Sequence, residues 1–182
     1  MESLDMDGAA KKYIVPAFIV LALSSAAYLA WVDDQNNQTL DAENVPFGVE
    51  KGYRLRDVEV TGLDGKPIPF SDYRGSILVV DFMAPWCSPC KEQIKVLIRL
   101  SQSTDAEILS INVDPGYNST YLARFRDDEK MTWTLASSAE AAMEYKVTAI
   151  PLILVADRDG VIRYRGYYTT LTKFQQIIDE IG

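Results

Sequence analysis

Cys87 and Cys90 stand shortly after an apolar run and shortly before a helical pattern, and this order constrains the fold more than any other feature of the sequence. The run from Ser76 to Met83 is rich in isoleucine, leucine and valine, which is typical of a central strand buried on both faces. After Cys90 the apolar residues recur at helical spacing, beginning with Ile94 and Leu97. The cysteine pair is therefore expected where a strand passes into a helix.

The rest of the C-terminal part alternates between strand and helix patterns, which predicts one α/β domain. Turn signals at Asp64-Gly65 and Asp159-Gly160 predict two hairpins. The remaining expected elements are strands over 53–60, 66–69, 107–113, 152–156 and 161–168, helices over 118–130 and 138–145, and a closing helix from Thr170.

The stretch from Tyr13 to Val32 is apolar and carries no charge over twenty residues, which as a helix would span roughly 30 Å of hydrocarbon. Two lysines precede it and two aspartates follow it, so the bias of basic residues toward the cytoplasm places residues 1–12 inside and the rest outside. A cleaved signal peptide is the alternative, with small residues Ser25 and Ala27 at a cleavage site, although such apolar cores run about 7–15 residues. A buried globular helix would show a polar face, and this stretch shows none.

The expected organisation has four parts. A short cytoplasmic N-terminus over 1–12 leads into a transmembrane helix or signal anchor over 13–32. Residues 33–52 are polar and acidic with little periodicity, which predicts a linker. Residues 53–182 then form the folded domain outside the cell membrane.

Composition excludes several classes of function. The 182 residues include 26 acidic and 18 basic side chains, for a formal charge of −8, so no basic surface is expected for nucleic acid. Histidine is absent, which removes the commonest general base and most transition-metal sites. Two cysteines fall short of a four-ligand zinc site, so no metal is expected and the chemistry rests on the cysteine pair.

Cysteine attacks as a thiolate, and the backbone N–H groups at a helix start lower the thiol pKa. Cys87 would occupy that start and act as the nucleophile, while Cys90, one turn on and deeper, would resolve the mixed disulfide. The alternative is an inert disulfide or two incidental thiols. Lys91 stands where a c-type haem site needs histidine, which excludes haem attachment. Asp81 lies within the apolar run and is a candidate proton acceptor for Cys90, unless it is hydrated at a strand end.

The segment Val80-Asp81-Phe82-Met83-Ala84-Pro85-Trp86-Cys87-Ser88-Pro89-Cys90-Lys91 closely resembles the thioredoxin active site. Tyr145-Lys146-Val147-Thr148-Ala149-Ile150-Pro151 resembles the thioredoxin loop whose cis-proline lies against the cysteine pair. The stretch 53–75 and the motif 157–160 look like the TlpA/ResA branch of membrane-tethered thioredoxins. The resemblance covers residues 53–182 and implies a thioredoxin fold, a central mixed β-sheet flanked by helices, with an N-terminal β-hairpin extension.

The resemblance also implies roles and partners. Asp81 matches the buried carboxylate and Trp86 the aromatic beside the nucleophile, while Ile150 and Pro151 match the cis-proline pair that binds substrate. Members of this branch typically reduce disulfides of proteins outside the cytoplasm, including apocytochromes, and draw electrons from a membrane donor of the DsbD/CcdA type. No cofactor is expected beyond the redox-active disulfide. The sequence departs from the family pattern at Met83, Gln93, Lys95, Ser110 and Leu152.

Three hypotheses follow for the function. The first is a protein-disulfide reductase, because the dipeptide Ser88-Pro89 resembles the Gly-Pro of thioredoxin more than the Pro-His of oxidising relatives. Thioredoxin has a reduction potential of about −270 mV, whereas a strong oxidant lies near about −120 mV. The second is an oxidase or isomerase on the same fold, and the third is a tethered binding module with an incidental cysteine pair. A peroxiredoxin is disfavoured because its peroxidatic cysteine would stand in a different local pattern.

Overall fold

A computed structural model describes residues 45–182 of the chain. The expected membrane segment over 13–32 and most of the expected linker lie outside the described residues. Within 45–182, no helix has both the length and the apolar character needed to cross a membrane.

Residues 45–52 belong to the domain, although the sequence analysis assigns them to the linker. Val45 and Val49 are buried, and β1 (Phe47–Gly48) pairs in parallel with β2 (Arg54–Leu55). Burial of these two valines explains why the domain starts earlier than the periodicity indicates, because isolated valines in a polar segment give no recognisable pattern.

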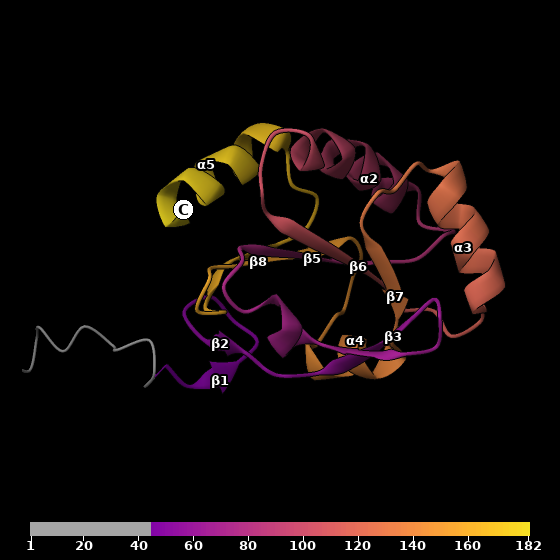
Figure 1. Ribbon diagram of the computed structural model, residues 1–182, viewed down its shortest axis with the longest axis horizontal. Coiled ribbons are helices and arrows are strands. Elements are labelled where there is room, and N and C mark those ends of the chain that lie inside the picture. Colours follow the sequence, from indigo (N-terminus) through magenta and orange to yellow (C-terminus); the bar gives the residue numbers. More distant parts are fainter. Residues whose placement is uncertain (1–44) are drawn as a thin grey trace, which may run out of the picture. The chain divides into compact units, whose positions relative to one another are not determined.

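A seven-stranded mixed sheet forms the centre of the domain, in the order β4-β3-β7-β6-β5-β8-β9 (Figure 1). Strands β5, β6 and β7 run parallel, while every other neighbouring pair is antiparallel. The strands are β3 (Glu59–Gly62), β4 (Pro67–Pro69), β5 (Leu78–Met83), β6 (Glu107–Asn112), β7 (Thr134–Ser137), β8 (Leu152–Ala156) and β9 (Ile162–Gly166).

Helices cover both faces of this sheet (Figure 1). Helices α2 (Ser88–Ser101), α3 (Ser119–Asp128) and α5 (Leu171–Ile181) pack on one face, and α4 (Ala139–Glu144) packs on the other. Side chains of Asn118, Ser138 and Thr170 cap α3, α4 and α5 by accepting backbone N–H bonds, which explains where these helices begin.

Strand β5 is buried on both faces, as its apolar sequence predicts. Val80 and Phe82 point toward the side of α4, and Val79 and Met83 point toward α2. The predicted hairpin turns are also present, and Gly65 and Gly160 adopt φ values of +81° and +73°, a region that favours glycine.

One strand prediction was wrong in detail, and one strand was not predicted. The strand expected over 53–60 is split into β2 and the start of β3, because Val58 N–H bonds to the Arg56 carbonyl and the chain turns between them. Strand β7 was missed, because its four residues carry too little alternation to be recognised without its neighbours β6 and β3.

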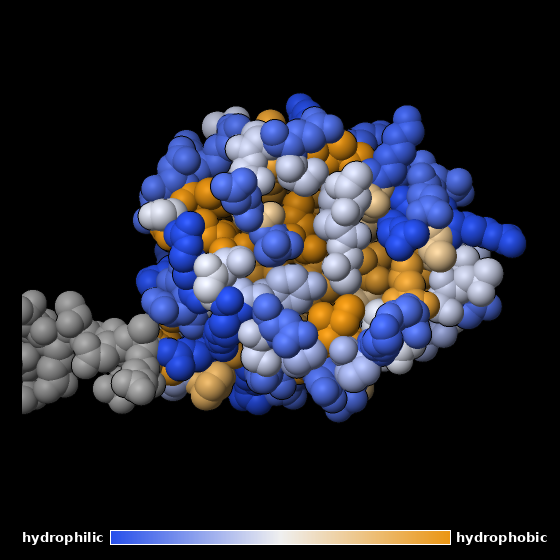
Figure 2. All heavy atoms as spheres, viewed as in Figure 1, coloured by the Kyte–Doolittle hydropathy of each residue, from blue (hydrophilic) through white to orange (hydrophobic). Residues whose placement is uncertain are grey.

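Polar side chains cover most of the edge of the domain in the view of Figure 2, and hydrophobic ones show between them toward the centre. A few large apolar side chains are nonetheless exposed, among them Trp86 and Met143 with 60% and 73% of their surface accessible. Both lie in the region of the cysteine pair, as described next.

Candidate active site

Cys87 and Cys90 form a disulfide at the start of α2, shortly after the end of β5. Cys87 is the N-cap of α2, and its Sγ accepts the Cys90 backbone N–H at 3.2 Å. Cys90 is fully buried, while Cys87 keeps 3% exposure and borders a surface groove that Cys90 does not reach. An incoming sulfur can therefore approach Cys87 first.

The start of α2 contributes to the electrostatics of Cys87. Unpaired N–H groups of a helix N-terminus stabilise a thiolate in this position. The nearest lysine in sequence, Lys91, lies 3.9 Å from a Glu129 oxygen and 5.8 Å from the centre of the Phe125 ring. The charge of Lys91 is therefore partly compensated by the Glu129 carboxylate.

The loop that ends in Ile150-Pro151 lies against the cysteine pair. The Ile150–Pro151 peptide bond is cis, as the resemblance implies. The Ile150 carbonyl oxygen stands 3.8 Å from Cys87 Sγ. Pro151 is buried and immediately precedes β8, so the loop is anchored to the central sheet.

Trp86 stands exposed beside the nucleophile and is held by hydrogen bonds that the sequence analysis missed. Its indole Nε1 donates to Asp114 Oδ2 at 2.8 Å. Asp114 in turn accepts the Gly116 N–H at 2.8 Å, and its own carbonyl accepts a bond from the Asn112 side chain at 2.7 Å. Only the Asp114-Pro115-Gly116 turn composition hints at this support.

A groove of about 790 Å³ runs past Cys87. Its walls come mainly from three segments far apart in sequence, namely the turn that carries the cysteines, helix α4 and the cis-proline loop. They contribute Trp86, Ser88 and Pro89; Ala139, Ala142 and Met143; and Lys146, Val147, Thr148, Ala149 and Ile150, with Val113 from a fourth segment. Most of these side chains are apolar, so the groove offers an apolar contact surface beside Cys87.

Asp81 is fully buried in β5, and the hydrated alternative is therefore wrong. Its Oδ2 accepts a hydrogen bond from Ser110 Oγ at 3.0 Å, and its Oδ1 has no partner among the described residues. Burial raises the pKa of Asp81 to about 7, and the Ser110 hydroxyl opposes that rise. A carboxyl with this pKa can exchange a proton near neutral pH.

The structure explains three departures from the family pattern. Met83 is buried among Cys90 and its apolar neighbours. Ser110 bonds Asp81, as above. Gln93 is fully buried and makes two hydrogen bonds with the Thr169 backbone, which ties α2 to the segment before α5.

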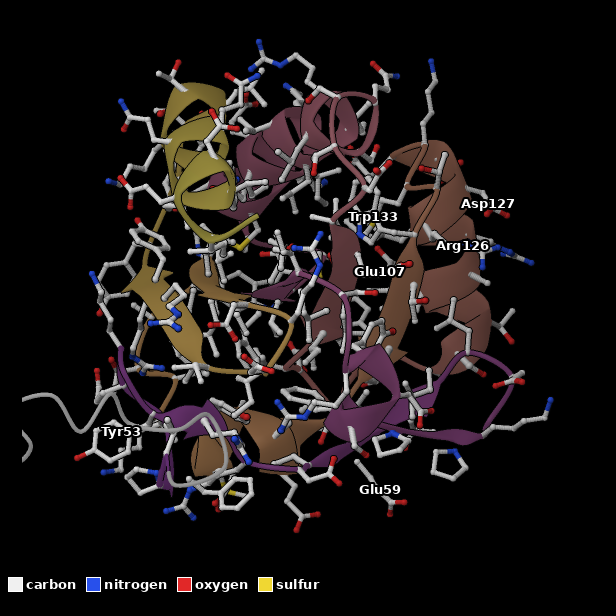
Figure 3. The ribbon with its side chains drawn as sticks, turned by 60° about the vertical axis from the view of Figure 1, so that its left-hand side comes forward. Tyr53, Glu59, Glu107, Arg126, Asp127 and Trp133 are labelled. Carbon is white, nitrogen blue, oxygen red and sulfur yellow. A yellow bond between two sulfur atoms is a disulfide. The ribbon has the colours of Figure 1, made fainter. Side chains whose placement is uncertain are left out.

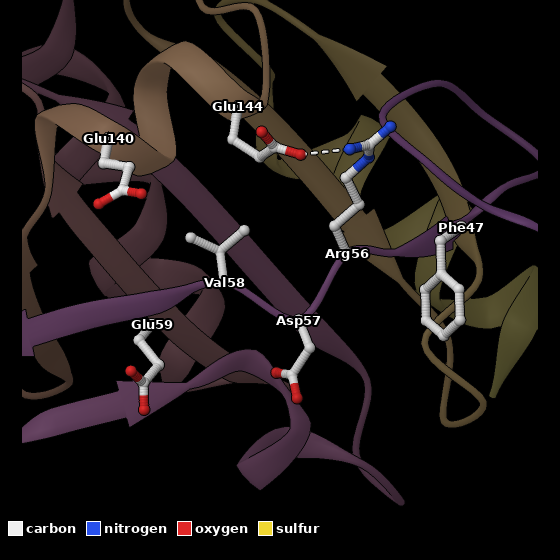
Figure 4. A pocket seen from close by; sticks show the side chains of 7 residues that line it. All are labelled: Phe47, Arg56, Asp57, Val58, Glu59, Glu140 and Glu144. Carbon is white, nitrogen blue, oxygen red and sulfur yellow. Dashed lines mark hydrogen bonds and ion pairs between the residues drawn. The ribbon is translucent and has the colours of Figure 1, made fainter.

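A second hollow of about 760 Å³ is lined by side chains of β1, α4 and the segment 56–59 (Figure 4). Its lining is mainly acidic, with Arg56 paired to Glu144, and it contains no thiol. Within residues 45–182, no three histidine, cysteine or acidic side chains are grouped to hold a metal ion. The disulfide formed by the chain's two cysteines borders the first groove instead, through Cys87.

Residues 52–165 match the sequence profile described as the AhpC/TSA family, which is more than half of the chain. The chain belongs to that family. The thioredoxin-like fold and the CxxC pair are consistent with it, and together they make the chain a thiol–disulfide oxidoreductase. The thioredoxin-superfamily prediction is confirmed.

Similar proteins carry related names. The thioredoxin-like protein YneN of Bacillus subtilis is 22% identical over 79% of this chain and 84% of its own length. Thiol-disulfide oxidoreductase ResA of Bacillus thuringiensis is 24% identical over 63% and 68%, and methylamine utilization protein MauD of Methylobacillus flagellatus is 23% identical over 90% and 80%.

Solved structures support the fold. A thiol-disulfide oxidoreductase from Bacteroides fragilis superposes with a TM-score of 0.61 at 18% identity, covering 71% of this chain and 99% of that one. StoA from Bacillus subtilis gives a TM-score of 0.56 at 18% identity, covering 68% and 96%.

Proposed function

We propose that the Cys87–Cys90 pair reduces disulfides of proteins outside the cytoplasm. The observation that carries this proposal is the position of Cys87, which caps α2 at the edge of an apolar groove, beside the Ile150 carbonyl. The Cys87 thiolate attacks a substrate disulfide and forms a mixed disulfide. Cys90 then attacks Cys87, and the substrate leaves reduced while the pair is oxidised.

The reducing direction is supported by the surroundings of Cys87. A cation beside the nucleophile stabilises the thiolate and so makes the disulfide strongly oxidising. Here the dipeptide between the cysteines is Ser88-Pro89, and Lys91 is engaged by Glu129 and the Phe125 ring. We expect a potential near that of thioredoxin, about −270 mV.

The location and partners follow from the sequence pattern and the family resemblance. The apolar segment over 13–32 tethers the domain to the cell membrane as a single span, with residues 53–182 outside. An extracytoplasmic reductant needs electrons from the cytoplasm, which calls for a membrane donor of the DsbD/CcdA type. Apocytochromes are among the disulfide-containing substrates that the resemblance indicates.

Trapping in membranes tests the proposal directly. A Cys90→Ser variant can attack but cannot resolve, so it should accumulate mixed disulfides with substrates, whereas Cys87→Ser should not. Equal trapping by both variants would contradict the assigned order of attack. Absence of any trapped protein would favour a binding module with incidental cysteines.

The redox potential decides between reductase and oxidase. Equilibration of the protein with a dithiothreitol or glutathione buffer should give a value near about −270 mV, and a value above roughly −180 mV would favour the oxidase or isomerase. Thiol-dependent consumption of peroxide, measured on the same preparation, would instead identify a peroxidase.

Labelling in intact cells tests the location. A membrane-impermeant thiol reagent should modify Cys87 after mild reduction without lysis. Labelling that requires lysis would contradict the orientation, and a soluble mature form beginning near Tyr28 would indicate a cleaved signal peptide.

A further inference from the structure

Asp81, Ser110 and Trp133 form a chain of hydrogen bonds beneath α2. Asp81 in β5 and Ser110 in β6 are register partners in the parallel part of the sheet, and both are fully buried. Ser110 Oγ lies 3.0 Å from Asp81 Oδ2, and Trp133 Nε1 lies 3.0 Å from Ser110 Oγ. Trp133 precedes β7 and is half-buried (Figure 3).

The chemistry of the three groups sets the direction of the chain. An indole N–H can only donate, so Trp133 occupies a lone pair of the Ser110 oxygen. The hydroxyl proton of Ser110 is then available for Asp81 Oδ2, which accepts it. The other carboxylate oxygen, Oδ1, is buried and has no partner among the described residues. Ser110 thus fixes Oδ2 of Asp81 as the acceptor of its hydrogen bond, and Oδ1 keeps no hydrogen-bond partner among the described residues.

The position of Asp81 along β5 relates this chain to the cysteines. On the face that α2 covers, Asp81 lies between Val79, which packs in the cluster of Leu97, and Met83, which packs in the cluster of Cys90. Asp81 is therefore under the N-terminal half of α2, on the same side of the sheet as Cys90.

We propose that Ser110 and Trp133 are positioning residues that hold Asp81 with its free Oδ1 as the oxygen that takes the proton of Cys90. This inference rests on the proposed function. In the resolving step the Cys90 S–H proton passes to Asp81, and the Cys90 thiolate attacks Cys87 Sγ. The Cys87–Cys90 bond forms as the bond from Cys87 to the substrate sulfur breaks. The electron pair of the broken bond leaves with the substrate thiolate.

No charged group within the described domain competes with Ser110 for control of Asp81. The buried residues of α2 and of β8 are uncharged, and the only other titratable group among them is Cys90. Glu107 at the start of β6 is exposed, and with Arg126 it borders the surface hollow next to Trp133 (Figure 3). The pKa of Asp81 is raised by burial and lowered by Ser110, and no ion pair contributes.

The test is the pH profile of resolution in full-length protein, started from the reduced form. One equivalent of a chromogenic aromatic disulfide, dithiobis-nitrobenzoate, releases one thiolate when Cys87 attacks and a second when Cys90 resolves. Stopped-flow absorbance separates the two phases. In the wild type, the rate of the second phase should rise with pH as Asp81 ionises. The pH profile of Asp81→Asn should lack that inflection.

Removal of the Ser110 hydroxyl should raise the pH midpoint of the second phase, that is, the pH at which its rate is half-maximal. Because a hydrogen bond to a charged group is worth about 1.5–3 kcal/mol and one pH unit corresponds to about 1.4 kcal/mol, Ser110→Ala should shift it upward by about 1 to 2 pH units. Trp133→Phe should shift it upward by less, since the hydroxyl remains but is no longer oriented. Ser110→Thr, which keeps a hydroxyl, should return the midpoint toward that of the wild type.

Ser101→Ala is the matched control, because within residues 45–182 the Ser101 hydroxyl bonds only the Ile98 carbonyl at the end of α2. The pH midpoint of the second phase in this control should stay at the wild-type value. The rate of the first phase should be the same in all variants. An unshifted midpoint in both Ser110→Ala and Trp133→Phe, with only a lower melting temperature, would overturn the inference. Failure of the proposed reductase function would look different, since it would give no second release of thiolate or a potential above roughly −180 mV.

Discussion

Gln93 provides a quantitative test of how α2 is held in place. Its Nε2 donates to the Thr169 carbonyl at 3.1 Å, and its Oε1 accepts the Thr169 N–H at 2.7 Å. Gln93 is fully buried and Thr169 is 2% exposed. Gln93→Leu keeps the side-chain size but leaves a buried N–H and a buried C=O without partners.

Each unsatisfied group costs about 1–3 kcal/mol, so the variant should lose about 2–6 kcal/mol of the free energy of unfolding. For a domain of this size each kcal/mol lowers the melting temperature by roughly 3–5 °C. Thermal unfolding followed by circular dichroism, on the oxidised protein, measures the loss. Gln176→Leu, an exposed position in α5, is the matched control and should leave the melting temperature nearly unchanged.

Gln93→Glu refines the test, because a carboxyl can replace both bonds only while it is protonated. The ionised form keeps the bond from Thr169 N–H but turns a lone pair toward the Thr169 carbonyl. Burial should raise the pKa of this carboxyl above its unfolded value, so the native state binds the extra proton and stability falls as the pH rises. A Gln93→Leu melting temperature within about 2 °C of wild type, or a Gln93→Glu variant with no such pH dependence relative to wild type, would refute the reasoning.

Three further predictions concern the groove, a turn and the buried carboxyl. Met143→Ala removes an exposed side chain from the wall of the groove. The loss of about 1–2 kcal/mol of apolar burial against the substrate should lower kcat/KM for a protein disulfide about 5- to 30-fold. The rate of reduction of a small disulfide should stay unchanged. Gly160→Ala should destabilise the domain by about 1–2 kcal/mol in urea melts, because φ is +73° and a Cβ would lie 1.1 Å from the Arg74 Nη1 that bonds the Asp159 carbonyl; an unchanged midpoint would contradict this. Burial raises the pKa of Asp81 to about 7, whereas the unfolded carboxyl ionises at about 3.9, so the native state holds this proton longer and stability should fall between about pH 4 and pH 7. Asp81→Asn should remove that part of the fall, and an equal fall in both proteins would contradict the assigned pKa.

Local patterns were sufficient for much of the fold. The apolar run before Cys87 and the periodicity after Cys90 each concern a few consecutive residues, and both elements formed where they were expected. The glycines of the two hairpin turns carry their conformational preference with them. Cysteine spacing and the motif around it likewise led to the thioredoxin superfamily.

Elements without a strong pattern of their own were not predictable. Strand β7 exists because β6 and β3 supply hydrogen-bond partners on both sides, not because its four residues favour a strand. Val45 and Val49 belong to the domain because its core buries them.

The sequence by itself determined the thioredoxin-like α/β class, the position of the redox pair at a helix start, and the absence of histidine chemistry. Only the tertiary structure decided what surrounds that pair. The Asp114 carboxylate that holds Trp86, the Thr169 backbone that holds Gln93 and the Trp133 indole behind Ser110 are all more than 20 residues away in the chain from the groups they bond. The physical reason is that hydrogen bonds and burial depend on proximity in space, which spacing along the chain does not encode for segments joined through a sheet.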